Sequence, residues 1–252
     1  MVSKQAVDEF ERLDEELTVP AGQPRPILII VMGPASCGKS TIGTDLAESL
    51  SLPFIDGDSL HPQSNIDKMS QGHPLTDDDR LPWLALIRST AERECKSQFD
   101  EGNIRSRADG GVGRAGVIIA CSALKKWYRD ILRGEVEASP PGLNDLPQDK
   151  TKSPEHPFYP PNHPDIPATS NLQTLFLYCY GSPEVLQKRI AARKGHFMGA
   201  QMLVSQLATL EDPRGEGGVT WVDIDQPPEK VAADAVKRIR ALVDEQVSQK
   251  DP

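Results

Sequence analysis

The segment of residues 33–40, GPASCGKS, constrains this chain more than any other part of its sequence. It fits the pattern G-x-x-x-x-G-K-[S/T], in which glycines let backbone N–H groups turn inward and close on phosphate oxygens. The apolar run 27–32 precedes it, and Ile42, Leu46 and Leu50 follow at helical spacing. We therefore expect a buried strand, a phosphate-binding loop and a helix whose positive end faces the phosphates.

Each part of this loop has a role in binding a nucleoside triphosphate, which we predict to be ATP. Lys39 is expected to reach the β- and γ-phosphates and to act in catalysis, and the Ser40 hydroxyl is expected to hold Mg²⁺. ATP and Mg²⁺ are therefore the predicted cofactors. The other predicted ATP contacts in this stretch are Gly33, Ala35, Ser36, Cys37, Gly38 and Thr41.

Two other classes of phosphate-loop protein fit the sequence less well. A GTPase needs the order Asn-Lys-x-Asp, and the nearest string, NIDK at 65–68, has a different order. A motor or AAA-type ATPase needs an apolar strand that ends in an acidic residue. The apolar run 117–120 is followed instead by Cys121 and Ser122.

Further apolar runs predict an α/β fold with three layers and a parallel sheet of about five strands. Thr76-x-x-Asp79 resembles a capping box, and Ser182-Pro183 is typical of a helix start. Buried strands that alternate with helices indicate a sheet covered on both faces. The additional strands are expected at 52–58, 117–120, 175–180 and 221–224, and the last helix at about 229–247.

The chain of 252 residues is long enough for one domain, which we place at 27–248. Residues 1–26 are acidic, end in prolines and are expected to form a flexible arm. Two stretches interrupt the alternation of strands and helices and are interpreted as insertions. They are the Gly- and Arg-rich segment at about 102–116 and the Pro-rich segment at about 135–170.

Composition excludes several classes of protein. The net charge of −9 argues against nucleic-acid binding, which requires a basic surface. No apolar run approaches the roughly 20 residues of a membrane span, so no membrane contact is expected. The four cysteines form no C-x-x-C pair, and the start of the chain lacks a secretory pattern. We expect reduced thiols in a cytoplasmic protein.

Two carboxylates follow the second predicted strand, in the string Asp56-Gly57-Asp58. Ligands in open α/β sheets bind beyond the carboxyl ends of the strands, so both should face the phosphate loop. One carboxylate can accept a proton from a substrate hydroxyl, and the other can hold Mg²⁺. We assign the first role to Asp58 and the second to Asp56, although a simple Asx-type turn is an alternative.

Several further blocks have the order and spacing of a known family. Together with the phosphate loop they resemble the gluconokinase family of P-loop carbohydrate kinases over about 27–134 and 172–240. The blocks are DGDxLHP at 56–62, NIxKM at 65–69, PLxDDDRxPWL at 74–84, CSALKKxYRD at 121–130, ARKGHF at 192–197, QMLVSQ at 201–206 and VDIDQP at 222–227.

The resemblance implies a nucleoside-monophosphate-kinase-like fold with a helical lid, and the reaction of ATP with D-gluconate to give ADP and 6-phospho-D-gluconate, which feeds the pentose phosphate pathway. It also suggests a homodimer. Gluconate carries a carboxylate, which needs cations, and several hydroxyls, which need carboxylates and amides. The predicted substrate-binding residues are Asp58, His61, Met69, Arg80, Ser122, Lys125, Arg129 and Gln206.

Two arginines, Arg189 and Arg193, lie four residues apart and so share one helix face. In kinases that this chain resembles, a lid, here expected at about 190–212, closes over ATP, and its arginines neutralise charge on the transferred phosphoryl group. We predict a catalytic role for Arg193, with Arg189 binding ATP. An amphipathic helix with exposed arginines is the alternative. Gln226 and Pro227 are expected, from the resemblance, to flank the adenine.

The phosphate loop departs from the usual composition of the family at Pro34, Ala35 and Cys37. Pro34 has no backbone N–H to offer a phosphate. Cys37 puts a thiol beside the ATP site, where the helix start and Lys39 can lower its pKa. We therefore hypothesise inhibition by oxidation of this thiol.

Two alternatives to a gluconokinase stay open at the level of sequence. One is a related small-molecule kinase that acts on shikimate, adenylyl sulfate or a nucleoside monophosphate. The other is a non-catalytic regulatory protein that binds ATP and uses its insertions to contact a partner. The presence of Lys39, Asp58 and Arg193 favours an enzyme.

Overall fold

The computed structural model describes residues 19, 23–141, 145, 171–192 and 197–248. Most of the predicted arm at 1–26, most of the Pro-rich segment at 135–170, and Arg193 therefore lie outside the described residues. Within them, five parallel strands form one sheet in the order β2-β3-β1-β4-β5. The strands are β1 (Ile27–Met32), β2 (Phe54–Asp56), β3 (Gly116–Ala120), β4 (Gln173–Tyr180) and β5 (Val219–Asp223).

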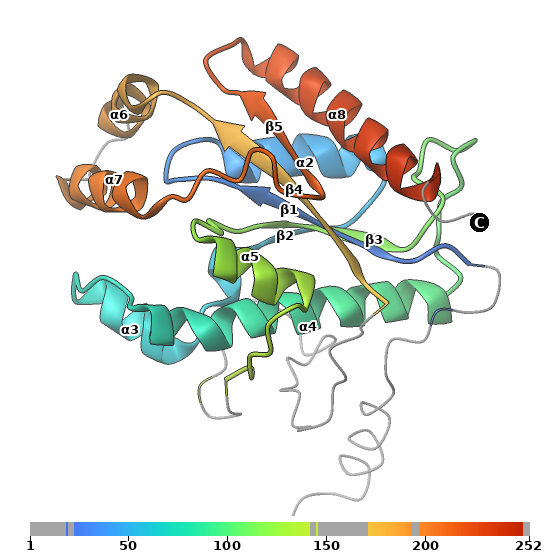
Figure 1. Ribbon diagram of the computed structural model, residues 1–252, viewed down its shortest axis with the longest axis horizontal. Helices are drawn as coiled ribbons and strands as arrows, with labels where there is room; N and C mark the ends of the chain where they lie inside the picture. The colour runs from blue at the N-terminus through green and yellow to red at the C-terminus, as the bar shows by residue number, and fades with distance from the viewer. Residues whose placement is uncertain (1–18, 20–22, 142–144, 146–170, 193–196, 249–252) are drawn as a thin grey trace, which may run out of the picture.

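Helices cover both faces of this sheet, as Figure 1 shows: α2 (Lys39–Leu50) and α8 (Pro228–Ser248) lie on one face, and α4 (Asp77–Asp100) and α5 (Lys126–Arg133) on the other. Three further helices gather at the end of the molecule toward which the strand arrows point (Figure 1). They are α3 (Gln63–Ser70), α6 (Pro183–Ala192) and α7 (Phe197–Thr209). The predicted three-layer α/β architecture is therefore confirmed.

The central strand β1 explains why both faces need a cover, because all six of its residues are buried. Ile27, Ile29 and Val31 point into the core under α2 and α8, whereas Leu28, Ile30 and Met32 point into the core under α4 and α5. Full burial of each such side chain stabilises the fold by about 1.5–3 kcal/mol. The side chains of this uninterrupted apolar run therefore pack alternately on the two faces of the sheet.

Helix α4 begins as its sequence predicts. Thr76 accepts a hydrogen bond from the backbone N–H of Asp79, and the Asp79 carboxylate accepts one from the backbone N–H of Thr76, which completes a capping box. Pro82 is the sixth residue of the helix, so it lies inside the helix and cannot donate the i→i−4 hydrogen bond of its position. Leu84, Ile87, Ala91 and Cys95 form the inner face of the helix and are buried.

Other local predictions need correction. The second strand, expected at 52–58, is only Phe54–Asp56, because the chain turns into a short 3-10 helix at Gly57–Leu60. Helix α3 was not predicted, since only Asn65 of its residues is buried and it has no apolar periodicity. The Gly- and Arg-rich stretch forms turns against the body of the domain, where Arg240 donates a hydrogen bond to the carbonyl of Gly110 at 3.0 Å.

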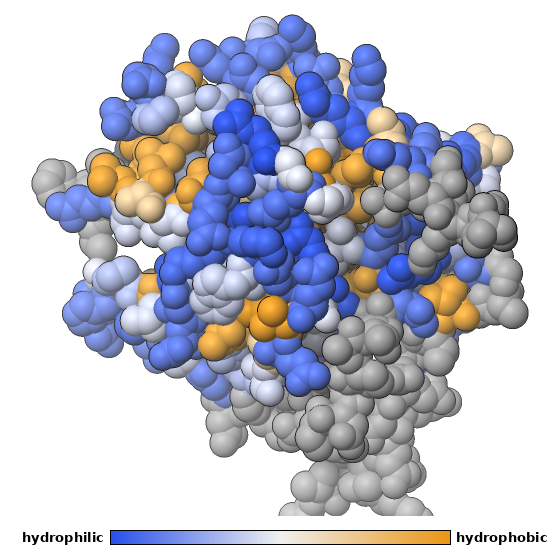
Figure 2. All heavy atoms as spheres, viewed as in Figure 1, coloured by the Kyte–Doolittle hydropathy of each residue, from blue (hydrophilic) through white to orange (hydrophobic). Residues whose placement is uncertain are grey.

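Figure 2 shows a largely hydrophilic surface with apolar patches, one of them at the end where α6 and α7 lie. Met202 and Val204 on α7 are among the exposed large apolar residues. No helix in the described part of the chain is long and apolar enough to cross a membrane.

Candidate active site

The phosphate loop runs from the end of β1 to the start of α2, as predicted. Gly33 and Gly38 have φ angles of 141° and 98°, which side-chain-bearing residues rarely adopt. The ammonium group of Lys39 turns back over the loop and donates hydrogen bonds to the carbonyls of Gly33 and Pro34, both at 3.1 Å. The loop therefore has the fold and the cation required to hold phosphate oxygens.

The hydroxyl of Ser40 and the carboxylate of Asp56 lie together beside this loop. Ser40 Oγ donates a hydrogen bond of 2.8 Å to Asp56 Oδ2, although the two residues belong to α2 and to the end of β2. Hydroxyl and carboxylate oxygens suit Mg²⁺, which usually takes its other ligands from phosphates and water. The described residues contain no group of three or more acidic, His or Cys side chains that could hold a metal ion.

Asp58 lies next to this pair, since its backbone N–H donates to Asp56 Oδ1 at 3.1 Å. Partial burial of the Asp58 carboxyl and the nearby charge of Asp56 raise its pKa, while Lys39 lowers it. Asp58 is nevertheless exposed to solvent, so its carboxylate is accessible to a substrate. A raised pKa makes it a better proton acceptor, as a general base requires.

His61 is held in one tautomer on the acceptor side of the site. The Nδ2 amide of Asn65 donates to the carbonyl of Asp79 at 2.8 Å, which fixes its orientation, and lies 3.3 Å from His61 Nδ1. Because this amide nitrogen can only donate, Nδ1 accepts and Nε2 carries the proton. The ring stacks on Trp83 at 4.1 Å between centroids, and burial and the charge of Arg80 lower the His61 pKa to about 4.

A carboxylate links two elements near His61. Asp77, at the start of α4, accepts hydrogen bonds from Lys125 Nζ at 2.6 Å and from the Tyr128 hydroxyl. These bonds, with the charges of Lys125 and Arg80, lower the Asp77 pKa. Arg80 Nη1 donates to the carbonyl of Thr76 at 3.0 Å. Two predicted cations, Lys125 and Arg80, therefore lie on the same side of the site.

Arg129 does not belong to this group, and its prediction as a substrate ligand is corrected. The side chain is 0% exposed and forms an ion pair with Glu216. Its guanidinium also donates to the carbonyls of Ala123, Leu124 and Glu211. A buried arginine whose donors are used in this way stabilises the fold and is not available to a ligand.

Residues of the last third of the chain reach the phosphate loop. Gln206 on α7 accepts a hydrogen bond of 2.6 Å from the backbone N–H of Ala35, so it lies against the phosphate loop. Arg189 on α6 donates to the carbonyls of Ile224 and Cys37, at 2.6 and 3.4 Å. Arg193, the predicted catalytic arginine, lies outside the described residues.

The remaining predicted residues take varied positions. The carbonyl of Ser122 accepts a hydrogen bond from the backbone N–H of Gly33 at 3.3 Å, so Ser122 borders the loop. Met69 on α3 is exposed. The side-chain oxygen of Gln226 is buried and lacks a hydrogen-bond partner among the described residues, while Pro227 is exposed beside it.

Four residues of the site were not predicted individually: Asn65, Asp77, Trp83 and Tyr128. Trp83 donates from its indole nitrogen to the carbonyl of Gly57 at 2.8 Å, which ties α4 to the turn that carries Asp58. All four lie inside the sequence blocks at 65–69, 74–84 and 121–130. The sequence signal that could have pointed to these four residues was their polar or aromatic character within such a block.

These features define a class of protein. The parallel sheet has the order 2-3-1-4-5, with a phosphate loop after its central strand and two carboxylates at the end of the edge strand β2. These are the features of a P-loop kinase for small molecules. The shikimate kinase family model matches residues 35–74, which contain most of this loop and both carboxylates.

Longer matches identify the family. The chain is 34% identical over 227 residues to a probable gluconokinase of Schizosaccharomyces pombe, covering 90% of this chain and 94% of that protein. It is 36% identical to the thermoresistant gluconokinase of Escherichia coli, covering 84% and 93%. A gluconokinase structure from Sinorhizobium meliloti superposes with a TM-score of 0.62 at 34% identity, covering 91% and 100%. The chain belongs to the gluconokinase family.

Proposed function

We propose that this protein transfers the terminal phosphoryl group of ATP to D-gluconate and forms 6-phospho-D-gluconate, a product that feeds the pentose phosphate pathway. The observation that carries the proposal is the position of Asp58 directly beside the Ser40–Asp56 pair. This position puts an exposed carboxylate of raised pKa at the edge of the phosphate loop. The gluconokinases to which the chain is similar support gluconate as the acceptor.

The chemistry assigned to the chain begins at Asp58, which takes the proton from the 6-hydroxyl of gluconate as its oxygen forms a bond to the γ-phosphorus. The bond from that phosphorus to the bridging oxygen breaks, and ADP leaves. Lys39, Arg189 and Arg193 are proposed to hold the negative charge of the transferred group. Ser40 and Asp56 would hold Mg²⁺, which neutralises phosphate charge when it is bound.

The acceptor side is proposed to recognise a polyhydroxy acid. Arg80 and Lys125 supply the positive charge for its carboxylate, and the protonated Nε2 of His61 donates to a hydroxyl. Ser122, Met69 and Gln206 are proposed to line the space between acceptor and phosphate loop. Gln226 offers its buried side-chain oxygen, which has no hydrogen-bond partner among the described residues, to an adenine amino group, with Pro227 beside it.

Further proposals concern the molecule as a whole. We propose a single kinase domain at 27–248, with a flexible arm at 1–26, insertions at about 102–116 and 135–170, and a lid at about 190–212. A homodimer and a cytoplasmic location complete the proposal. All four cysteines are free and buried in the structure, as expected for a reducing compartment.

A panel of acceptors tests the proposed substrate. ADP release would be measured with ATP and Mg²⁺ and with D-gluconate, shikimate, adenylyl sulfate or AMP, using a Lys39→Met variant to measure background hydrolysis. We expect turnover with D-gluconate well above the others. Better turnover with another acceptor, or background rates with all of them, would contradict the proposal.

A further inference from the structure

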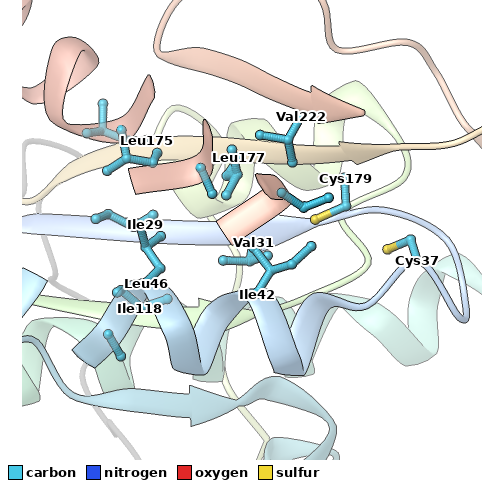
Figure 3. Packing of buried hydrophobic residues seen from close by; sticks show 14 of the residues in the cluster. Ile29, Val31, Cys37, Ile42, Leu46, Ile118, Leu175, Leu177, Cys179 and Val222 are labelled. Atoms are coloured by element: carbon cyan, nitrogen blue, oxygen red, sulfur yellow. The ribbon is translucent and has the colours of Figure 1, made fainter. Parts of the chain in front are cut away.

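Two cysteines meet at the base of the phosphate loop. Cys37 lies in the loop, and Cys179 follows Tyr178, the residue of β4 that pairs with Met32 at the end of β1. Both are 0% exposed, and a hydrogen bond links their side chains. Figure 3 shows Cys37 on the loop and Cys179 on β4 near one another at the same end of the core, with the sulfur of Cys37 on the side that faces Cys179.

Gly33 allows this close approach. A Cβ atom placed on Gly33 would lie 2.9 Å from Cys37 Sγ and 3.6 Å from the Cβ of Cys179. Both cysteine side chains therefore border the same small space beside a residue that has no side chain. Two cysteines that border one small space are candidates for a disulfide, in which the Cβ atoms lie about 3.5–4.5 Å apart.

The surroundings make the two thiols unequal. Burial opposes ionisation of Cys37, but its pKa is lowered by the hydrogen bond from Cys179, by the charge and backbone N–H of Lys39, and by the charge of Arg189. The pKa of Cys179 is raised by the same hydrogen bond and by burial. Cys37 therefore has the character of the attacking thiolate and Cys179 that of the resolving thiol. By contrast, burial raises the pKa of Cys95 and of Cys121 to about 12.

We propose that Cys37 and Cys179 form a reversible disulfide when the protein meets a peroxide, and that this disulfide switches off nucleotide binding. The thiolate of Cys37 attacks one peroxide oxygen, the O–O bond breaks, and the leaving hydroxide takes up a proton to become water. The sulfur of Cys179 then attacks the resulting sulfenic acid, losing its proton, while the S–O bond breaks and a second water leaves. Two equivalents of a small thiol reverse the step by thiol–disulfide exchange. The first forms a mixed disulfide with one cysteine and releases the other, and the second releases the remaining cysteine and leaves as the disulfide of the small thiol.

The disulfide would affect nucleotide binding because of where the two cysteines lie, and this step rests on the proposed ATP site. A disulfide would tie the loop to β4 through the residue that precedes Gly38 and Lys39, so the N–H groups that hold phosphate would be displaced. Displacement by about 1 Å can cost about a hundredfold in activity. Cys37 is part of this loop and is buried, so bound ATP, by holding the loop in place, should slow oxidation.

The test uses the full chain and needs no acceptor substrate. The reduced protein would be treated with hydrogen peroxide, with and without ATP and Mg²⁺. Peptide mass spectrometry without reduction would then measure the link between residues 37 and 179, and a fluorescent ATP analogue would measure nucleotide binding. We expect a linked peptide that forms more slowly with ATP, a loss of nucleotide binding in proportion to the link, and recovery of binding with dithiothreitol.

Matched variants separate this account from general damage. Cys179→Ala should bind nucleotide before treatment and form no link, whereas Cys95→Ala, which changes an equally buried cysteine elsewhere, should behave as the parent does. Cys179→Ser would be used if the alanine variant unfolds early in a thermal scan. Absence of the link in the parent, a link that leaves binding unchanged, or a Cys37→Ser variant that loses binding as fast as the parent would overturn the proposal. Because no readout involves gluconate, failure of the proposed reaction would leave this result intact.

Discussion

At the scale of single residues, Asp58 carries the proposed chemistry. Replacing Asp58 by Asn keeps the shape but removes the proton acceptor, so we expect turnover to fall by about a hundredfold to ten-thousandfold. Affinity for ATP should change little, because the Ser40–Asp56 pair and Lys39 remain. Steady-state kinetics together with nucleotide binding would separate these effects. Asp67→Asn, at an exposed carboxylate of α3, is the control, and equal rates in both variants would remove Asp58 from the mechanism.

The protonation of His61 gives a second prediction at this scale. Its pKa is about 4 in the folded protein against an ordinary value of 6.5. The unfolded chain therefore binds this proton at higher pH than the folded chain. The contribution to stability is fully present above pH 6.5 and is lost as the pH falls toward 4, by at most about 3 kcal/mol.

A His61→Gln variant lacks this titration. Unfolding in urea at several pH values should show its free energy of unfolding approaching that of the parent as the pH falls from 7 to 4. A difference between the two proteins that stays constant over this range would show that His61 does not titrate as described.

At the scale of secondary-structure elements, the ion pair of Arg129 with Glu216 joins α5 to the segment before β5. Glu216→Gln leaves a fully buried guanidinium without its counter-charge, and we expect a loss of about 3 kcal/mol in stability. The KM for gluconate of the folded fraction should not change. Denaturant unfolding and kinetics of this variant and of Glu137→Gln, at an exposed carboxylate, provide the comparison. A large change in KM without a loss of stability would return Arg129 to the substrate site.

The accuracy of the sequence predictions also differs between elements. Strand β1 and the start of α4 could be predicted because continuous apolar residues and a capping box act locally. Helix α3 could not, since it has almost no buried face to leave a pattern. Arg129 was assigned to the substrate because sequence records its charge but neither its burial nor its pairing with Glu216, 87 residues away. The meeting of Cys37 and Cys179 likewise depends on the pairing of β1 with β4.

At the scale of the whole molecule, the sheet brings distant segments to one end. The phosphate loop follows β1, Asp56 ends β2 with Asp58 just beyond it, Ser122 follows β3, and Arg189 follows β4 on α6. Figure 1 shows α3, α6 and α7 at the same end, so acceptor and nucleotide residues meet although they are far apart in the chain. The fold thus supports a reaction between two bound substrates and not nucleotide binding alone.

The central claim is that this chain phosphorylates gluconate at its 6-hydroxyl. The most direct measurement is to incubate the protein with ATP, Mg²⁺ and D-gluconate and to identify the product by mass spectrometry and phosphorus-coupled carbon NMR. We expect one phosphoryl group on gluconate, attached at carbon 6, in amounts equal to the ADP released. Release of ADP without phosphorylated gluconate, or phosphate on another carbon, would contradict the claim.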